Sequence, residues 1–371
     1  MRTNCKVLAL VLALVLAVTC FTACGAKTEE AAAPAEAAAP AEAAPAAAAE
    51  VQEAAAAAEG EMRTYYLCSS HQAHPYFADS HLALRYAAEY FQVNIVAAGP
   101  EGWDTKAQAE AIEQAIAKKP NGIITRMWDD SPAEAIKKAM DAGIPVVLTE
   151  TRTDVNPALT YIGLDNYQCG RDTAAELVKV AGDSGKLVCM GNWGASNTDA
   201  KLKGVKDYIA ENCPDWEIIA EVDDKAATAD AIEAAKSVFN NYPEVTAIVG
   251  LDSSSGTGVS MAMEELNKEP GSIHVVVHDR EAATLEYIKA GYIDSTLINK
   301  TAGCEYMAIL LMEDWNNGGL KNIPISADNA AAGINPIPEN MYQTAAIINA
   351  DNVDLFFADA LPTIETDLYN Y

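Results

Sequence analysis

Residues 119–150 read KPNGIITRMWDDSPAEAIKKAMDAGIPVVLTE, which is one complete strand–helix–strand pattern. The apolar runs at 122–125 and 145–148 flank a segment whose apolar residues recur at helical spacing. Short apolar runs joined through a helix are typical of buried parallel strands. The same plan returns at residues 241–279, NYPEVTAIVGLDSSSGTGVSMAMEELNKEPGSIHVVVHD. This internal repeat predicts two similar α/β lobes rather than one long sheet.

The alternation of strands and helices extends over most of residues 62–371 and predicts parallel sheets with helices on both faces. A chain of this length is enough for two domains of about 150 residues each. Strands are expected at 64–68, 93–97, 122–125, 145–148, 160–162, 186–190, 216–222, 247–251, 274–277 and 295–298. Helices are expected at 78–91, 105–118, 132–142, 169–181, 200–212, 227–239, 258–266, 281–290 and 303–315.

The first 61 residues do not follow this alternation. Arg2 and Lys6 precede an apolar run and then small residues up to Cys24, so residues 1–23 have the three regions of a signal peptide. The segment from Phe21 to Cys24 resembles the bacterial lipobox, which implies that Cys24 becomes a lipid-bearing N-terminus. Residues 24–61 consist largely of Ala, Pro and Glu, and this composition predicts a solvated tether.

The composition excludes several classes of function. The chain has 53 acidic and 25 basic residues, a net charge of −28, and such a surface repels nucleic acid and anionic lipid. The five cysteines after Cys24 are odd in number and lack CxxC spacing, which argues against a disulfide framework and a zinc site. We expect most of them to pack as small apolar side chains. No cofactor, metal or nucleic-acid partner is expected.

No catalytic motif is complete in the sequence. GDSGK at 182–186 lacks the spacing of a phosphate-binding loop, and GLDSSSG at 250–256 has Asp252 where a serine nucleophile elbow requires Gly. No nucleophile, base and orienting group can be assembled from the remaining residues. The sequence therefore favours a binding protein over an enzyme.

Polar and aromatic residues gather in the segments that follow the expected strands. Ligands of open parallel sheets bind beyond the carboxyl ends of the strands, so a binding site is expected there. These segments contain His74, Tyr76, Phe77, Trp103, Arg126, Trp128, Glu150, Arg152, Trp193, Asn197, Asp199, Asp252, Ser253, Ser254, Asp279, Arg280 and Asn299.

In this order, the segments resemble the type I periplasmic binding proteins, specifically the ribose-binding-protein-like sugar receptors of ABC importers. The resemblance covers most of residues 62–330. It rests on HPYF at 74–77, which matches the family's Asn-Pro-Phe-Phe, and on VVVHD at 275–279, which matches Val-Gly-Phe-Asp. The segments AGIPVVLTE at 142–150 and YIGLDNYQCGR at 161–171 add to it.

The resemblance implies two Rossmann-like lobes joined by three crossovers that close on a ligand. The first lobe is expected to hold residues 62–164 and 300–330, and residues 165–299 and 331–371 are expected to form the second lobe and a crossover tail. The implied function is an extracytoplasmic solute-binding lipoprotein that delivers its ligand to a membrane permease. The alternative is a sensory receptor for a chemoreceptor or sensor kinase. A repressor is disfavoured because a leader and a tether stand where a DNA-binding helix-turn-helix is expected.

The resemblance also implies roles for aromatic residues. Tyr76 and Phe77 match positions whose rings stack on a sugar in the family, and Trp128 and Trp193 are expected to offer opposing surfaces. His74 stands where the family has Asn, and we expect it to act as a neutral hydrogen-bonding partner.

The carboxylates are expected to orient the ligand. Asp279 matches the family's ligand-binding Asp, Glu150 stands where the family often has Asp, and Asn299 where it has an amide. A carboxylate accepts hydrogen bonds from adjacent hydroxyls, and a ligand without them leaves it unpaired. For Asp252 two interpretations stay open, ligand binding and capping of a helix that begins near Gly256.

The chain departs from the ribose-receptor pattern at several positions. Thr151 stands where an Arg usually follows the acid, with Arg152 one residue later, and Asp199 stands where ribose receptors have another Arg. Leu251 occupies the position of an Asn. Two arginines are lost and carboxylates are gained, so the expected ligand is a different sugar, a polyol, an amino sugar or another cationic polar molecule.

Overall fold

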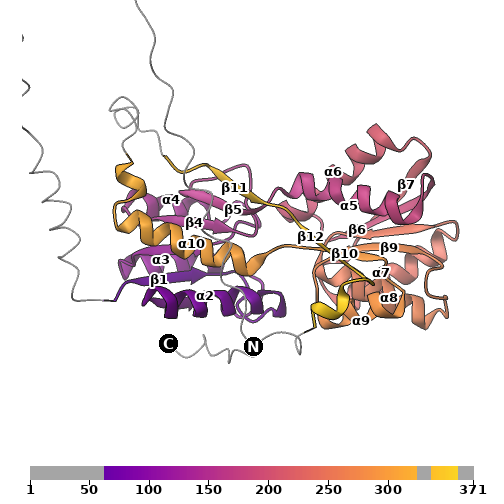
Figure 1. The fold of residues 1–371 in the computed structure, drawn as a ribbon, viewed down its shortest axis with the longest axis horizontal. Coiled ribbons are helices and arrows are strands. Elements are labelled where there is room, and N and C mark those ends of the chain that lie inside the picture. Colours follow the sequence, from indigo (N-terminus) through magenta and orange to yellow (C-terminus); the bar gives the residue numbers. More distant parts are fainter. Residues whose placement is uncertain (1–61, 324–335, 358–371) are drawn as a thin grey trace, which may run out of the picture. The chain divides into compact units, whose positions relative to one another are not determined.

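The computed structural model describes residues 62–323 and 336–357. The expected signal peptide, Cys24 and the tether of residues 24–61 lie outside the described residues. Within the described ranges, the strands form two sheets of six, and each sheet is the centre of one lobe (Figure 1). The prediction of two α/β lobes with parallel sheets is confirmed.

The first sheet has the strand order β11-β5-β4-β3-β1-β2, and all its described pairings are parallel. Its strands are β1 (Thr64–Cys68), β2 (Asn94–Ala98), β3 (Gly122–Thr125), β4 (Val146–Thr149), β5 (Thr160–Leu164) and β11 (Asn340–Gln343).

The second sheet has the matching order β12-β10-β9-β8-β6-β7, and only β12 runs antiparallel to its neighbour. Its strands are β6 (Gly185–Gly191), β7 (Trp216–Asp223), β8 (Ala247–Gly250), β9 (His274–His278), β10 (Ser295–Ile298) and β12 (Ala346–Asn349).

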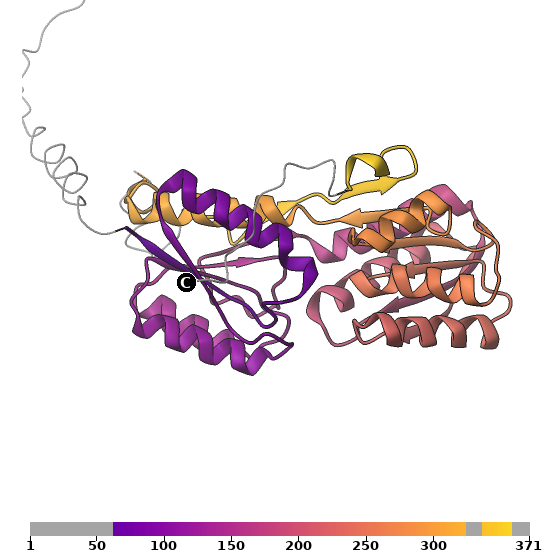
Figure 2. The ribbon, with the colours of Figure 1, turned by 90° about the horizontal axis from the view of Figure 1, so that it is seen from below.

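Helices cover both faces of each sheet. In Figures 1 and 2, α2 and α10 lie over one face of the first sheet, and α3 and α4 over the other. In the second lobe α5 and α6 pack together, as do α7 and α8. Their bounds are α2 (Ala78–Phe91), α3 (Thr105–Ala117), α4 (Ala133–Asp141), α5 (Asn166–Ala181), α6 (Ser196–Asn212), α7 (Thr228–Asn241), α8 (Ser253–Glu265), α9 (Ala282–Ala290) and α10 (Thr301–Asn316). Short 3-10 turns occur at η1 (Pro75–Phe77), η2 (Leu320–Asn322) and η3 (Val353–Leu355).

Successive residues of a strand point to opposite sides of the sheet. The central strands are apolar at both kinds of position, so each sheet is apolar on both faces. In the second lobe, Val188 and Met190 pack in the cluster under α7 and α8, while Cys189 packs in the cluster under α5 and α6. The described cysteines are unpaired and buried, which confirms that they act as small apolar side chains. Within residues 62–323 and 336–357, no helix combines the length and apolar character that crossing a membrane requires.

The expected elements exist, and their ends shift for local reasons. The largest shift is α8, which was expected from Gly258 and begins at Ser253, because Asp252 accepts hydrogen bonds from the backbone N–H groups of Ser254 and Ser255. The capping interpretation of Asp252 is thereby confirmed. Strands β11 and β12 are additional to the strands expected from the apolar runs.

Over residues 62–323 and 336–357, the chain crosses between the lobes three times. The crossings follow β5 and β10, and a third lies between β11 and β12 (Figure 1). Residues 331–371 were expected as second-lobe residues and a crossover tail; β11 pairs with β5 of the first sheet, and β12 joins the second. The hydrogen bonds of β11 thus place residues 340–343 on the first-lobe side of this crossover.

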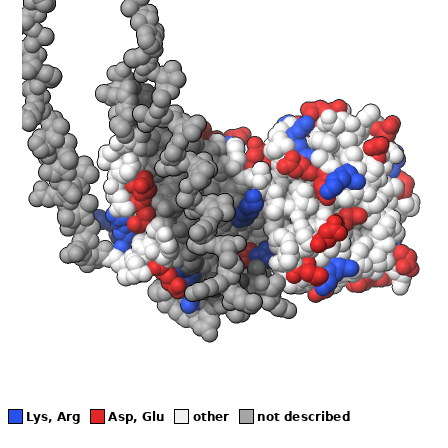
Figure 3. Space-filling model, in the orientation of Figure 1, with Lys and Arg blue, Asp and Glu red and all other residues white. Residues whose placement is uncertain are grey.

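Figure 3 shows acidic and basic side chains interspersed over the visible face of the second lobe. The negative net charge is therefore not gathered into one patch on this face.

Candidate functional site

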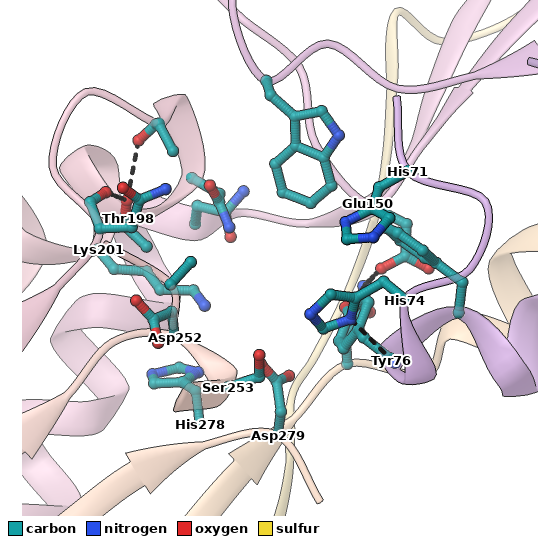
Figure 4. A pocket seen from close by; sticks show the side chains of 18 of the residues that line it. His71, His74, Tyr76, Glu150, Thr198, Lys201, Asp252, Ser253, His278 and Asp279 are labelled. Atoms are coloured by element: carbon teal, nitrogen blue, oxygen red, sulfur yellow. Dashed lines mark hydrogen bonds between the residues drawn. The ribbon is translucent and has the colours of Figure 1, made fainter. Parts of the chain in front are cut away.

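A cavity of about 370 Å³ lies where residues of both lobes meet at the carboxyl ends of the strands. Figure 4 shows Lys201, Asp252, His278 and Asp279 on one side of it, facing His71, His74 and Glu150 on the other. This is the position that the parallel topology predicts for a ligand site.

Glu150 follows β4 and lies on the first-lobe side of the cavity. Its φ of 69° is in the left-handed region that residues other than Gly rarely adopt. Its Oε2 accepts hydrogen bonds from the Tyr76 hydroxyl at 2.6 Å and from the Asn299 amide at 3.1 Å. Burial raises the pKa of Glu150, and the positive charge of Arg126 and hydrogen bonds from Tyr76, Asn299 and Ser80 oppose that shift.

A fully buried ion pair supports the first-lobe side. One Arg126 nitrogen lies 2.5 Å from Glu305 Oε1, and neither side chain is exposed. Thr149 donates to the same Glu305 oxygen at 3.0 Å. Burial raises the pKa of Glu305 to about 7, against the opposing charge of Arg126. The Arg126 guanidinium also lies 4.3 Å from the centre of the Phe77 ring, so it fixes the base of the aromatic wall.

The aromatic wall consists of Tyr76, Phe77, Trp103 and Trp128. The rings of Tyr76 and Phe77 meet edge to face at 5.1 Å, and Trp128 lies 6.4 Å from Phe77 and 5.3 Å from Trp103. Phe77 is only 3% exposed, so little of its ring can reach a ligand. Aromatic walls of this kind suit the C–H faces of small polar molecules.

Asp279 follows β9 on the second-lobe side and has a φ of 71°. Its carboxylate has no hydrogen-bond partner among the described side chains and backbone groups. Burial raises its pKa to about 6; the ammonium of Lys201 lowers it, and the charges of Asp252 and Glu150 raise it. Lys201 comes from α6, is 5% exposed, and donates to the Leu251 carbonyl at 3.2 Å.

Asp224 and Asp252 form a pair of acids close to Asp279. Burial, followed by the hydrogen bond with Asp252 and repulsion from its charge, raises the pKa of Asp224 to about 8. Ser255 donates to Asp224 at 2.5 Å. The pair therefore shares one proton at neutral pH, and Asp252 lines the cavity.

Ser196 joins the second lobe to the first beside the cavity, in addition to the Asn299–Glu150 hydrogen bond. The backbone N–H of Ser196 donates to the Trp128 carbonyl at 3.1 Å, and its hydroxyl donates to the Met127 carbonyl at 3.2 Å. The same hydroxyl lies 3.0 Å from Thr151 Oγ1. On another side of the lobes, Arg280 pairs with Asp79 at the start of α2.

Eleven of the residues in these segments are predicted to bind the ligand, and the structure brings eight of them to this cavity and separates three. Trp103, Asn197 and Ser253, from the same segments, line it as well. His74, Tyr76, Phe77, Trp128, Glu150, Asp252, Asp279 and Asn299 line it. Arg152 and Asp199 line a neighbouring cavity of about 620 Å³ instead, where Asp199 accepts from the Gly194 N–H. Trp193 packs against the core cluster under α5 and α6. The roles of all eleven in ligand binding remain predictions.

Sequence reasoning did not select several residues that line the cavity, above all Lys201 and His278. Thr198 and Lys201 are three residues apart on α6, and Asn197 precedes them, so the first turns of this helix face the cavity. The available signal was the position of these residues after an expected strand, but the helix was expected to begin only at Ala200. Among the described residues, no three His, Cys, Asp or Glu side chains gather in a way that could hold a metal ion.

The family described as "Periplasmic binding protein domain" has a sequence profile that matches residues 65–319. A curated relative, the xylose/arabinose-binding protein XylF of Sulfolobus acidocaldarius, is 25% identical over 243 residues. That alignment covers 60% of this chain and 58% of XylF, so the chain spans less than two thirds of that relative's length.

Solved structures share the fold. A sugar-binding protein of a sugar ABC transporter from Bacillus halodurans is 24% identical, with a TM-score of 0.73 over 80% of this chain and 100% of that one. AraP, an arabinose-binding protein from Geobacillus stearothermophilus, is 26% identical, with a TM-score of 0.71 and the same coverage.

Proposed function

We propose that this chain, which belongs to the periplasmic binding protein domain family, is the extracytoplasmic solute-binding component of an ABC transporter. It captures a small sugar or sugar-like molecule between its lobes and delivers it to a membrane permease. In this proposal the chain is a binding protein and not an enzyme. The family match and the sugar-binding names of the similar proteins support that role. The names of the similar proteins, which bind xylose, arabinose or sugars in general, support the ligand class.

One observation carries the proposal: carboxylates from both lobes point into one cavity beside an aromatic wall. Glu150 comes from the first lobe and Asp279 from the second, so a ligand that contacts both stabilises the arrangement in which the lobes are close. A sugar supplies hydroxyl donors for the carboxylates and C–H faces for Tyr76 and Trp128.

Calorimetry with a panel of pentoses, hexoses, polyols and amino sugars tests this function. We expect at least one ligand to bind, and Asp279→Ala to weaken it by roughly tenfold or more, since a hydrogen bond to a charged group contributes about 1.5–3 kcal/mol. The exposed Asp130→Ala in the loop after β3 is the matched control and keeps the affinity. Binding that is unchanged in Asp279→Ala would place the site elsewhere.

We also propose that the protein is anchored by lipid on Cys24, with residues 24–61 as a tether. The resemblance of the segment before Cys24 to a lipobox supports this. Fractionation of cells that express Cys24→Ala tests it: the variant is expected in the soluble extracytoplasmic fraction, and retention in the membrane fraction would contradict the anchor.

A further inference from the structure

The unsatisfied hydrogen-bonding groups around the cavity are mainly acceptors. Glu150 is 5% exposed, and its Oε1 has no partner. Asn197 Oδ1 is also buried without a partner. The carboxylate of Asp279, which is half-exposed toward the cavity, also makes no hydrogen bond to another described residue. Buried acceptors without partners are costly, so these atoms require donors from the bound molecule.

His278 adds another acceptor. The Thr173 hydroxyl donates to the Cys169 carbonyl at 2.8 Å and lies 2.9 Å from His278 Nε2. Because that hydroxyl has already used its proton, Nε2 must carry the hydrogen of a neutral imidazole, which leaves Nδ1 as an acceptor. Burial lowers the pKa of His278 well below its usual value, with Lys201 adding to the shift, so the ring stays neutral.

The charges of the cavity do not balance. Three carboxylates line it, those of Glu150, Asp252 and Asp279. Two lysines, Lys201 and Lys225, also line the cavity. The ammonium of Lys225 pairs with Asp230 at 2.8 Å near the surface, so the ammonium of Lys201 is left beside the three carboxylates. The guanidinium of Arg126 is held by Glu305 behind the wall. With one buried ammonium against three carboxylates, the cavity has an unmet preference for positive charge.

We propose that the natural ligand carries a protonated amino group in addition to hydroxyls, as in an amino sugar or an amino polyol. This inference rests on the proposed binding function and narrows its ligand class. An ammonium group has three donors and no acceptor, so it matches free carboxylate oxygens that come from both lobes. A neutral sugar of the same shape supplies weaker donors and leaves the excess negative charge in place.

Matched sets of ligands test the inference by calorimetry on the purified protein. Each amine, D-glucosamine, D-galactosamine and D-mannosamine, is compared with its neutral parent sugar and with its N-acetyl derivative, which keeps the ring but loses the charge. At least one amine is expected to bind about tenfold or more tightly than both counterparts, since hydrogen bonds to charged groups contribute about 1.5–3 kcal/mol.

Variants locate the preference. Asp279→Asn keeps the shape of the side chain and is expected to reduce the ratio of amine to neutral affinity by about tenfold. Asp252→Asn, which can still cap α8, is expected to reduce it as well. Asp130→Asn, which removes an equal charge from an exposed loop, is the matched control and leaves the ratio unchanged. Thermal melts confirm that each variant is folded.

The outcomes separate the two proposals. If a neutral sugar binds at least as tightly as every amine tested, or if neither cavity variant changes the ratio, the amino group is rejected and the sugar-binding function stands. If no sugar of either kind binds, within these sets or the wider panel, the proposed function fails and the inference fails with it.

Discussion

Glu150 follows β4 in the first lobe and Asp279 follows β9 in the second, and the backbone holds both in the same way. Their φ angles are 69° and 71°. Each N–H bonds to the next strand, Glu150 to the Ile162 carbonyl and Asp279 to the Leu297 carbonyl. Each carbonyl accepts from a hydroxyl on that strand, from Tyr161 and Thr296 respectively.

The surroundings of the two carboxylates differ. Glu150 accepts from Tyr76 and Asn299 and lies near the charge of Arg126, whereas Asp279 has no hydrogen-bond donor among the described residues. After β3 the first lobe has the buried Arg126, and after β8 the second lobe has the buried Leu251. The comparison teaches that equivalent backbone positions can give a prearranged side and a side that depends on the ligand.

Breaking the ion pair of the first lobe is expected to have the largest effect. Arg126→Met leaves Glu305 buried without its cation, and removal of one partner of such a pair costs about 3–5 kcal/mol in the free energy of unfolding. The matched control is Leu251→Met at the equivalent position, which conserves volume and costs less than about 1.5 kcal/mol. Urea unfolding at pH 7 measures both. If Arg126→Met and Leu251→Met lowered the free energy of unfolding equally, the two lobes would not differ at this position.

The next largest effect is expected from alanine substitutions of the two carboxylates, which should differ in their effect on the free energy of unfolding. Glu150→Ala deprives the Tyr76 hydroxyl and the Asn299 amide of their acceptor, which costs about 1–3 kcal/mol in the ligand-free protein. Asp279→Ala removes a carboxylate that has no donor and a pKa raised to about 6, so stability is unchanged or rises. Urea unfolding of the ligand-free variants at pH 8 measures both free energies of unfolding. A larger loss of stability in Asp279→Ala than in Glu150→Ala would contradict the comparison.

Stability of the ligand-free protein is expected to fall as the pH rises from 5 to 8. Burial raises the pKa of Asp224 and Glu281 to about 8, of Glu305 to about 7 and of Asp279 to about 6, so these acids bind more protons in the folded state than in the unfolded state over this range. The lowered pKa values of His74, His81 and His278 act in the opposite direction and reduce the fall at the acidic end. Three of the four acids belong to the second lobe. Asp224→Asn imitates the protonated acid and is expected to flatten the slope by up to about 1.4 kcal/mol per pH unit.

Unfolding curves at several pH values for the unaltered protein and for Asp224→Asn measure this slope. Thr228→Ala, at the start of α7 in the same lobe, serves as a control that leaves the slope unchanged. A stability that rises over this range, or a slope that Asp224→Asn leaves as it was, would contradict the assignment.

The smallest effect is expected from the ion pair between the lobes. Asp79→Asn weakens its contact with Arg280, and because both side chains are partly exposed the contact contributes about 0–1 kcal/mol. Ligand affinity is expected to fall less than about fivefold, and to fall less still in high salt. Calorimetry at low and high ionic strength measures this, and a loss above tenfold would mean that the contact controls access to the cavity.

Most of the fold was predictable because it depends on local patterns. The apolar runs that became β3, β4, β8 and β9 sit in two copies of one plan, and burial on both faces requires such runs wherever they occur. The short strands β11 and β12 were missed because each is half-exposed and paired with a partner far along the chain. Nothing in four residues of sequence specifies such a partner.

Part of the site was predictable because the carboxyl edge of a parallel sheet can be read from strand order. Glu150 and Asp279 follow strands directly, so their place at the cavity was expected. Lys201 was not, since it lies within a helix and reaches the cavity only through the packing of α6. Arg152 and Asp199 follow strands too, yet they line the neighbouring cavity.

The residues alone were enough to specify two α/β lobes and the edge at which the loops gather, because side-chain periodicity and strand direction are local properties. The charge environment of each carboxylate depended on tertiary packing. Whether a donor, an arginine or no partner lies beside an acid is set by segments more than a hundred residues apart, such as Glu150 and Asn299 or Arg126 and Glu305. Electrostatic interactions act through space, and the order of residues along the chain does not give those distances.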